Sequence, residues 1–258
     1  MTEFGDRRIR VLTISVSTLI VLMASTLLTS AVSGMTGLGG GVLLLSIIAS
    51  FVETDLIIPL HAAVQLMSNT SRITFFYRHI KWKIVILFVL GMIPGALIGI
   101  NVFNMLDEHV IKLAMGLFIL SIVFLPMNGK NRTGGYKMFV PVGFFAGLLG
   151  IFFGSIGPLI ARFFLRSDIS KEELVATKAA CQAVGHLMRI PLFIIIGINI
   201  LQYGQVLVYL GFMVVIGTLL GKRMLHQIPE PLFRIIFKVT LTIIALRIIF
   251  IEVLTVSI

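Results

Sequence analysis

Long apolar runs separated by short charged segments make up most of this chain, and the first run, from Val11 to Val52, contains no charged residue. A straight helix of that length would extend for about 63 Å, roughly twice the hydrocarbon thickness of a bilayer. The run must therefore break, and the expected place is the glycine group Gly34, Gly37, Gly39, Gly40 and Gly41. This predicts a first membrane span over about residues 11–32 and a second element over about 39–52, which is short for a full crossing.

The later apolar runs continue this pattern. Further spans are expected over about residues 57–77, 84–104, 110–127, 174–196, 205–221 and 232–251. The run from Met138 to Ala161 contains a second group of glycines, which predicts a second broken or re-entrant element. The uncharged stretch from Ile190 to Gly221 is too long for one span, and the expected turn is at Asn199–Gly204.

Composition agrees with a membrane protein. Of the 258 residues, 58% are hydrophobic and 12% are charged, whereas soluble domains contain about 25% charged residues. A span needs about 20 apolar residues, so the chain has room for about seven to nine spans. Arg7, Arg8 and Arg10 precede the first run, which is longer than a signal-peptide core and is interpreted as a retained span. The predicted fold is an all-α polytopic membrane protein, with residues 1–258 forming a single transmembrane domain.

Three motifs recur in the same order in the two halves of the chain, which predicts a repeat over residues 30–127 and 143–251. They are Gly34-x2-Gly37-x3-Gly41 with Gly147-x2-Gly150-x3-Gly154, Gln65-x6-Arg72 with Gln182-x6-Arg189, and Gly95-x3-Gly99 with Gly217-x3-Gly221. The segment 78–83 is basic and its counterpart 197–204 is uncharged, whereas 104–109 is acidic and its counterpart 222–230 is basic. Because basic loops stay on the cytoplasmic side, this reversal predicts that the repeats are inverted.

Signatures of enzymes are absent from the sequence. The glycine-rich stretch lacks the Lys-Ser/Thr of a phosphate-binding loop. The one cysteine, Cys181, allows no internal disulfide and has no partners for a metal site. We therefore expect no enzymatic activity, no cofactor and no metal. The net charge of +10 comes mostly from short loops, so membrane topology explains it better than nucleic-acid binding.

The two glycine-rich breaks and two polar helix faces are the candidate site. Helices broken inside a membrane present free backbone groups, and the N-termini of half-helices attract anions. Two stripes with i, i+4, i+7 spacing share the face of a helix each. The predicted substrate-binding residues are Gly37, Gly39, Gly40, Gly41, Gln65, Asn69, Arg72, Gly154, Ser155, Gly157, Gln182, His186 and Arg189.

Simpler interpretations of the same residues stay open. The glycines could serve close helix packing, and Arg72 could extend to the membrane interface. His61 is expected to be a packed histidine, and Lys178 is expected at a solvated helix end. No aspartate or glutamate lies in the middle of a span, so any ion coupling would need histidine or backbone-coordinated ions.

Several segments resemble the TauE/SafE sulfite exporter family over about residues 30–250. They are SGMTGLGGGVLLL, LHAAVQLMSNTSRITFFYRHIKWK and GMIPGALIGINV in the first half, and AGLLGIFFGSIGPLI and IGTLLGKRML in the second. The resemblance implies two related multi-helix halves and export of sulfite or organosulfonate-type anions across a bacterial cytoplasmic membrane. The second break has Gly154-Ser155-Ile156-Gly157-Pro158 in place of a triple glycine, so two equivalent sites are not implied.

These observations together predict a transporter of small anions that works by alternating access in the inner (cytoplasmic) membrane. The alternatives are a passive anion channel and a membrane-embedded assembly partner without transport, although the short loops offer a partner little surface. The expected partners are a small anionic substrate and the lipid bilayer, with no nucleic acid. Homo-oligomer and monomer are both compatible with the sequence.

Overall fold

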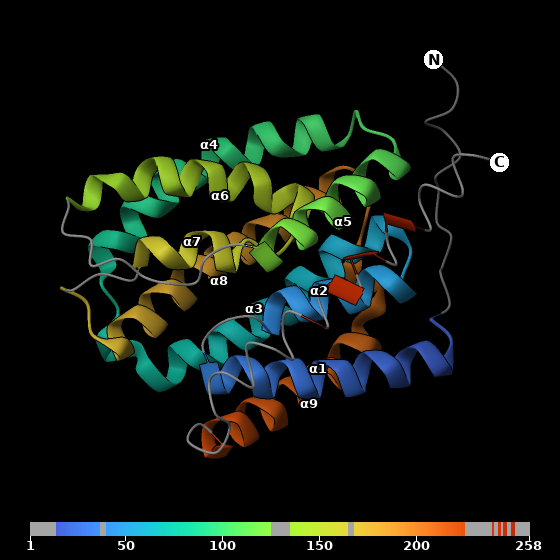
Figure 1. Cartoon of the computed structure of the whole chain (residues 1–258), viewed down its shortest axis with the longest axis horizontal. Coiled ribbons are helices and arrows are strands. Elements are labelled where there is room, and N and C mark those ends of the chain that lie inside the picture. Colours follow the sequence, from blue (N-terminus) through green and yellow to red (C-terminus); the bar gives the residue numbers. More distant parts are fainter. Residues whose placement is uncertain are drawn as a thin grey trace.

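The structure, a computed structural model, describes residues 14–36, 40–124, 135–164 and 168–224, with a few further residues between 239 and 250. All regular elements in these residues are helical, which confirms the all-α class (Figure 1). The helices are α1 (Val16–Thr36), α2 (Gly40–Phe51), α3 (Thr54–Phe76), α4 (Trp82–Phe103), α5 (Glu108–Phe124), α6 (Phe139–Phe153), α7 (Gly157–Phe164), α8 (Lys171–Ile195) and α9 (Gly204–Met224), with 3₁₀ turns η1 (Tyr77–His79), η2 (Tyr136–Met138) and η3 (Ile200–Tyr203).

Helix boundaries follow the glycine groups. The helix α1 ends at Thr36 and α2 begins at Gly40, while α6 ends at Phe153 and α7 begins at Gly157. The expected turn after α8 is present as Ile196–Asn199 followed by η3. Residues 11–13, Gly37, Gly39 and most of the expected span 232–251 lie outside the described residues.

Four described segments are long and apolar enough to cross a membrane. They are Val16–Gly34, Trp82–Phe103, Tyr136–Phe153 and Ile200–Gly221. The segments Gly40–Phe51 and His109–Ser121 are apolar but shorter. The helices α3 and α8 have 23 and 25 residues and are long enough, but polar residues lower their hydropathy. The count of seven to nine spans stays a prediction for the whole chain.

The helices form a layered bundle (Figure 1), and several polar side chains of α3 and α8 are buried inside it. In the view shown, α4 and α6 lie along the top and α1 and α9 along the bottom, with α3 and α8 packed together between these pairs. The outer faces of α4 and α9 expose large apolar side chains, including Ile86, Leu90, Leu97, Val208, Phe212 and Val215. Such faces suit contact with lipid, because lipid provides no hydrogen-bond partners.

Glycines allow each outer pair of helices to pack backbone to backbone. On α4, side chains at Gly91 and Gly95 would collide with the carbonyl groups of Val140 and Phe144 on α6. On α9, side chains at Gly217 and Gly221 would likewise meet the carbonyl groups of Leu27 and Ala31 on α1. The order of these contacts shows that the two helices of each pair run parallel. Small residues are the usual means of close helix packing in membranes.

Substitution Gly95→Leu should therefore disrupt the α4–α6 pair, because the nearest obstacle is the backbone of Phe144, which cannot rotate away. Overpacking of this kind costs about 3 kcal/mol. We expect a lower midpoint of thermal unfolding in detergent, measured by size-exclusion chromatography after heating. The matched control is Gly204→Leu, because Gly204 has no atom within 4 Å of its side-chain position. Equal midpoints for the two variants would contradict the close packing.

Candidate functional site

The helices α3 and α8 run antiparallel, so their polar stripes face each other. The backbone N–H of Lys81, just after α3, donates to Thr177 Oγ1 near the start of α8 at 2.9 Å. Near the other end of the contact, the rings of His61 and His186 lie edge to face, with centroids 5.7 Å apart. The stripes are His61, Gln65, Asn69 and Arg72 on α3 and Lys178, Gln182, His186 and Arg189 on α8.

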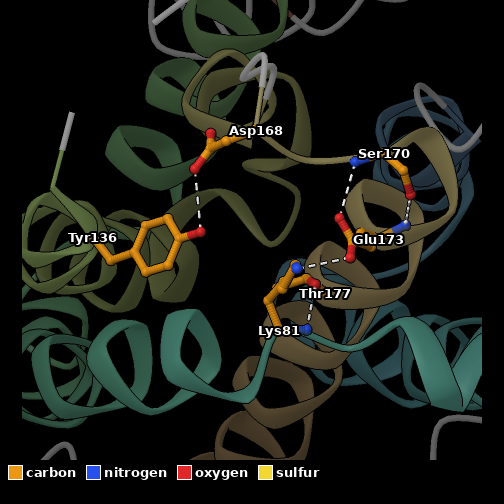
Figure 2. Close-up of polar contacts among 6 residues, drawn as sticks. All are labelled: Lys81, Tyr136, Asp168, Ser170, Glu173 and Thr177. Atoms are coloured by element: carbon orange, nitrogen blue, oxygen red, sulfur yellow. Dashed lines mark hydrogen bonds and ion pairs between the residues drawn. The ribbon is translucent and has the colours of Figure 1, made fainter. Parts of the chain in front are cut away.

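A polar cluster at one end of the bundle fixes the start of α8 (Figure 2). Ser170 caps the helix, since its side chain accepts from the N–H of Glu173 while the Glu173 carboxylate accepts from the N–H of Ser170. The same carboxylate pairs with Lys81 Nζ at 2.7 Å, which lowers the pKa of Glu173 and raises the pKa of Lys81. Tyr136 donates to Asp168 at 3.1 Å. These contacts hold α8 against the connection between α3 and α4.

The start of α2 lies against the second break. A Cβ atom at Gly41, in the first turn of α2, would lie 3.0 Å from Ser155 Oγ in the second break. The same position is 3.4 Å from the amide of Gln65. At the start of α7, a Cβ atom at Gly157 would lie 3.0 Å from Gln182 Nε2. Each half-helix therefore begins beside a glutamine amide, one from α3 and one from α8.

These half-helix starts offer unused hydrogen-bonding groups. The first N–H groups of a helix lack partners within the helix; in α7 these are the N–H groups of Gly157 and Leu159, because Pro158 has none and that of Ile160 donates to the carbonyl of Ile156. Among the described residues, the side-chain amides of Gln65 and Gln182 form no hydrogen bond. Both glutamines are mostly shielded from solvent. Because a buried amide without partners is unfavourable, this arrangement favours a ligand that accepts hydrogen bonds from both sides.

Arg189 braces the second break. Its Nη1 donates to the carbonyl oxygen of Gly154 at 2.6 Å and to His186 Nδ1 at 3.0 Å. A side chain at Gly150 would collide with this guanidinium group. The cation thus lies at the C-terminal end of α6, where the helix dipole favours positive charge. Direct binding of a ligand by Arg189 stays a prediction, because in this conformation Nη1 is occupied by protein acceptors.

The backbone at Gly154 needs glycine. Its φ of +59° and ψ of −50° are close to those of the strained γ-turn, and the N–H of Ser155 donates to the carbonyl oxygen of Phe153 across it. This turn directs the Gly154 carbonyl towards Arg189 and starts α7 three residues later.

Three cationic side chains are buried around the site. Arg72, Lys178 and Arg189 have relative exposures of 7%, 3% and 5%. Arg72 lies within electrostatic range of Lys178 and His186. Among the described residues no aspartate or glutamate is buried. The core of the candidate site therefore contains buried positive charge, and burying charge is costly.

Two residues outside the predicted set belong to this site. The expectation that Lys178 lies at a solvated helix end is wrong, because α8 begins at Lys171 and Lys178 is about two turns inside it. His61 is fully buried, and its Nε2 donates to the carbonyl oxygen of Gly41 at 2.9 Å. A signal for both was present in the sequence, since His61 and Lys178 precede Gln65 and Gln182 by one turn on the same helix face.

The structure brings most predicted residues together but leaves some at the margin. Gly41, Gln65, Ser155, Gly154, His186 and Arg189 form the centre through the contacts above, with Gly157 and Gln182 adjoining them. Gly40 instead faces Ser33 and Thr29 on α1. Asn69 donates to the carbonyl oxygen of Gln65 at 2.8 Å, and its Oδ1 is buried without a partner. Arg72 Nε donates to Ser68 at 3.3 Å, further along α3.

A small cavity lies beside the second break. It has a volume of about 10 Å³, and Gly154, Gln182, His186 and Arg189 are among the residues that line it. That is about the space that one water molecule requires, and ligand pockets are far larger. This cavity is therefore too small to hold a substrate anion.

Substitution Gly154→Ala should destabilise the protein, because a side chain at positive φ is strained by about 1–3 kcal/mol. We expect a lower thermal midpoint in detergent. The control Gly204→Ala, at an open position with ordinary helical φ, should leave the midpoint unchanged or raise it slightly. A Gly154→Ala protein as stable as wild type would show that the turn is not constrained as described.

Comparison with known proteins identifies the family. The protein-family model described as "Sulfite exporter TauE/SafE" matches residues 22–248. No curated protein sequence and no solved structure gives a significant match. The match includes both helix breaks and both polar stripes. The chain therefore belongs to the sulfite exporter TauE/SafE family, whose members are membrane transporters and not enzymes, and it is a multi-pass membrane protein.

Proposed function

We propose that this protein is a carrier for small sulfur-containing oxyanions, namely sulfite or organic sulfonates, in the cytoplasmic (inner) membrane, and that the anion binds where the two helix breaks meet. The observation that carries the proposal is the buried positive charge of Arg72, Lys178 and Arg189 beside two glutamine amides without protein partners. The family match supports transport of sulfur-containing anions in general.

Electrostatics favours an anionic substrate at this position. Buried ions without counter-charges are several kcal/mol less stable than in water, and a bound anion offsets part of that cost. The N-terminal ends of α2 and α7 add positive partial charge, because helix dipoles point in that direction. The positive charge of the site therefore favours a negatively charged substrate, and the shape of the site determines how large that substrate can be.

Hydrogen bonding favours an oxyanion with several oxygens. Sulfite and the sulfonate head group each present three oxygens, so one molecule can accept from the amides of Gln65 and Gln182 and from the backbone at the half-helix starts. Lys178 is near this position, since its Nζ lies 3.9 Å from the Cβ position of Gly157. Arg189 contributes its charge and holds the second break, while Arg72 adds charge from the α3 side.

We further propose that the two halves are inverted repeats. Thr36 and Phe153 end α1 and α6, Gly40 and Gly157 begin α2 and α7, and Thr54 and Lys171 begin α3 and α8; each pair is 117 residues apart. Gln65 and Gln182 have the same separation. An offset of 117 residues pairs Gly37 with Gly154. The glycine motif instead pairs Gly41 with Gly154, so the two alignments differ by about one helical turn.

Helix packing supports the same relation. If α1 corresponds to α6 and α4 to α9, the parallel pair of α1 and α9 corresponds to the parallel pair of α6 and α4. The helices α3 and α8 pack antiparallel against each other, as equivalent helices of inverted repeats would. Rocking one repeat against the other around the anion would then open the site to alternate sides of the membrane.

The transport test is uptake of labelled sulfite and a panel of organic sulfonates into proteoliposomes. Substitutions Gln65→Leu and Gln182→Leu should each raise the half-saturation concentration about 10–100-fold, because each removes a hydrogen bond to a charged ligand worth about 1.5–3 kcal/mol. Gln202→Leu is the control, since Gln202 is exposed in η3. Unchanged half-saturation in both site variants would contradict the proposed position of the anion, and uptake that does not saturate would favour a channel.

Topology provides a separate test. The start of α8 is tied to Lys81, so η1 and η3 lie at opposite ends of α8. We expect cysteines at His79→Cys and Gln202→Cys to react with an impermeant thiol reagent from opposite sides of the membrane. The native Cys181 is buried and can be replaced by alanine to provide a background without reactive thiols. Labelling of both positions from one side would contradict the inverted arrangement.

A further inference from the structure

His61 is the one histidine of the described core whose ring is held by the backbone of a helix break while one of its nitrogens has no partner. The carbonyl oxygen of Gly41 can only accept, so the contact at 2.9 Å places a hydrogen on His61 Nε2. In the neutral ring, Nδ1 then carries a lone pair. That atom is buried and has no hydrogen-bond partner.

The free nitrogen points towards the second break. It lies 3.2 Å from the Cβ position of Gly154, which the side chains of Ile58 and Leu45 also approach to 3.1 Å. Gly154 in turn lines the cavity and binds Arg189. His61 is therefore joined to the first turn of α2 through Nε2 and faces the second break through Nδ1, at the place where the anion is proposed to bind.

We propose that His61 Nδ1 binds a proton that is transported together with the anion, so that the protein is a proton–anion symporter. This inference rests on the proposed function and adds its coupling ion. The other histidine of the site is less suited to this role, because His186 Nδ1 already accepts a hydrogen bond from Arg189. A buried nitrogen without a partner gains one when it is protonated and an anion oxygen accepts from it.

The charges around His61 link the proton to the anion. Arg189 and His186 on α8 are the titratable groups that face it, and α1, α2 and α6, which also pack against α3, contain none in their described helices. The titratable groups of η1, η3 and α9 all lie within two turns of a helix end. They are Tyr77, Arg78, His79, Tyr203, Tyr209, Lys222 and Arg223. When no anion is bound, Arg189 repels a positive charge on His61. A bound anion attracts that charge.

Mutual attraction means that proton and anion favour each other's binding, which is the requirement for symport rather than exchange. In each cycle one proton adds to Nδ1 on one side of the membrane and leaves Nδ1 on the other side, with no bond to the anion formed or broken. A monovalent sulfonate and one proton together carry no net charge. Transport of such a substrate should therefore be insensitive to membrane potential.

The test uses methanesulfonate, the anion of a strong acid, which cannot itself carry a proton at accessible pH. Proteoliposomes containing a pH-sensitive dye are given radiolabelled methanesulfonate outside, with potassium and valinomycin setting the membrane potential. Wild type should acidify the interior by about one proton per sulfonate taken up, at a rate independent of potential. His61→Gln keeps a donor for the Gly41 carbonyl but takes up no proton, so it should transport or exchange sulfonate without acidification and become sensitive to potential. His79→Gln, in the exposed turn η1, should behave as wild type.

Sulfonate uptake by wild type without acidification, or acidification by a folded His61→Gln protein, would overturn the inference while leaving anion transport intact. A folded His61→Gln protein that neither takes up nor exchanges sulfonate would also overturn it, because the histidine would then be needed for binding itself. His61→Asn is the second variant if His61→Gln does not fold. Absence of uptake of both sulfite and sulfonates by wild type would contradict the proposed function, and this inference with it.

Discussion

The need to satisfy the free backbone ends of two broken helices, in a setting without bulk water, determines the rest of this structure. A bond from Arg189 to the carbonyl of Gly154 meets that need at the end of α6, and a bond from His61 to the carbonyl of Gly41 holds the first turn of α2. Both come from the central antiparallel pair α3 and α8, which can carry polar residues because the outer helices separate it from lipid (Figure 1). Glycines allow α4 to pack closely against α6 and α1 against α9, and these two outer pairs flank the central pair.

The side chains that support the helix breaks also form the proposed anion site. Bracing the breaks from within brings cationic and amide side chains into a core that contains no buried carboxylate among the described residues. Such a core lacks negative charge, and the half-helix starts and two glutamine amides lack acceptors. In the proposed function, one small oxyanion supplies both. Under that proposal, structural stability and substrate recognition depend on the same residues.

Much of the helical pattern could be predicted from sequence, because apolar runs longer than a bilayer must break and glycine groups mark where. The boundaries of α2 and η3 follow from that constraint, whereas the glycine group alone marks the break before α7. The spacing of Gln65, Asn69 and Arg72 on one face was equally readable. What spacing cannot give is how two helices are rotated and aligned against each other. For that reason the burial of Lys178, the bond from Arg189 to Gly154 and the pairing of His61 with His186 required three-dimensional structure.

The most direct test of the central claim is to locate the anion. Crystals grown with selenite, a heavier analogue of sulfite, allow its selenium to be placed by anomalous diffraction. The account predicts a selenium peak where the helix breaks meet, within hydrogen-bonding reach of Gln65 and Gln182 and close to Lys178. A peak at a different place in a protein that transports selenite, or a selenite-bound structure in which the two glutamines bond to protein groups instead, would contradict it.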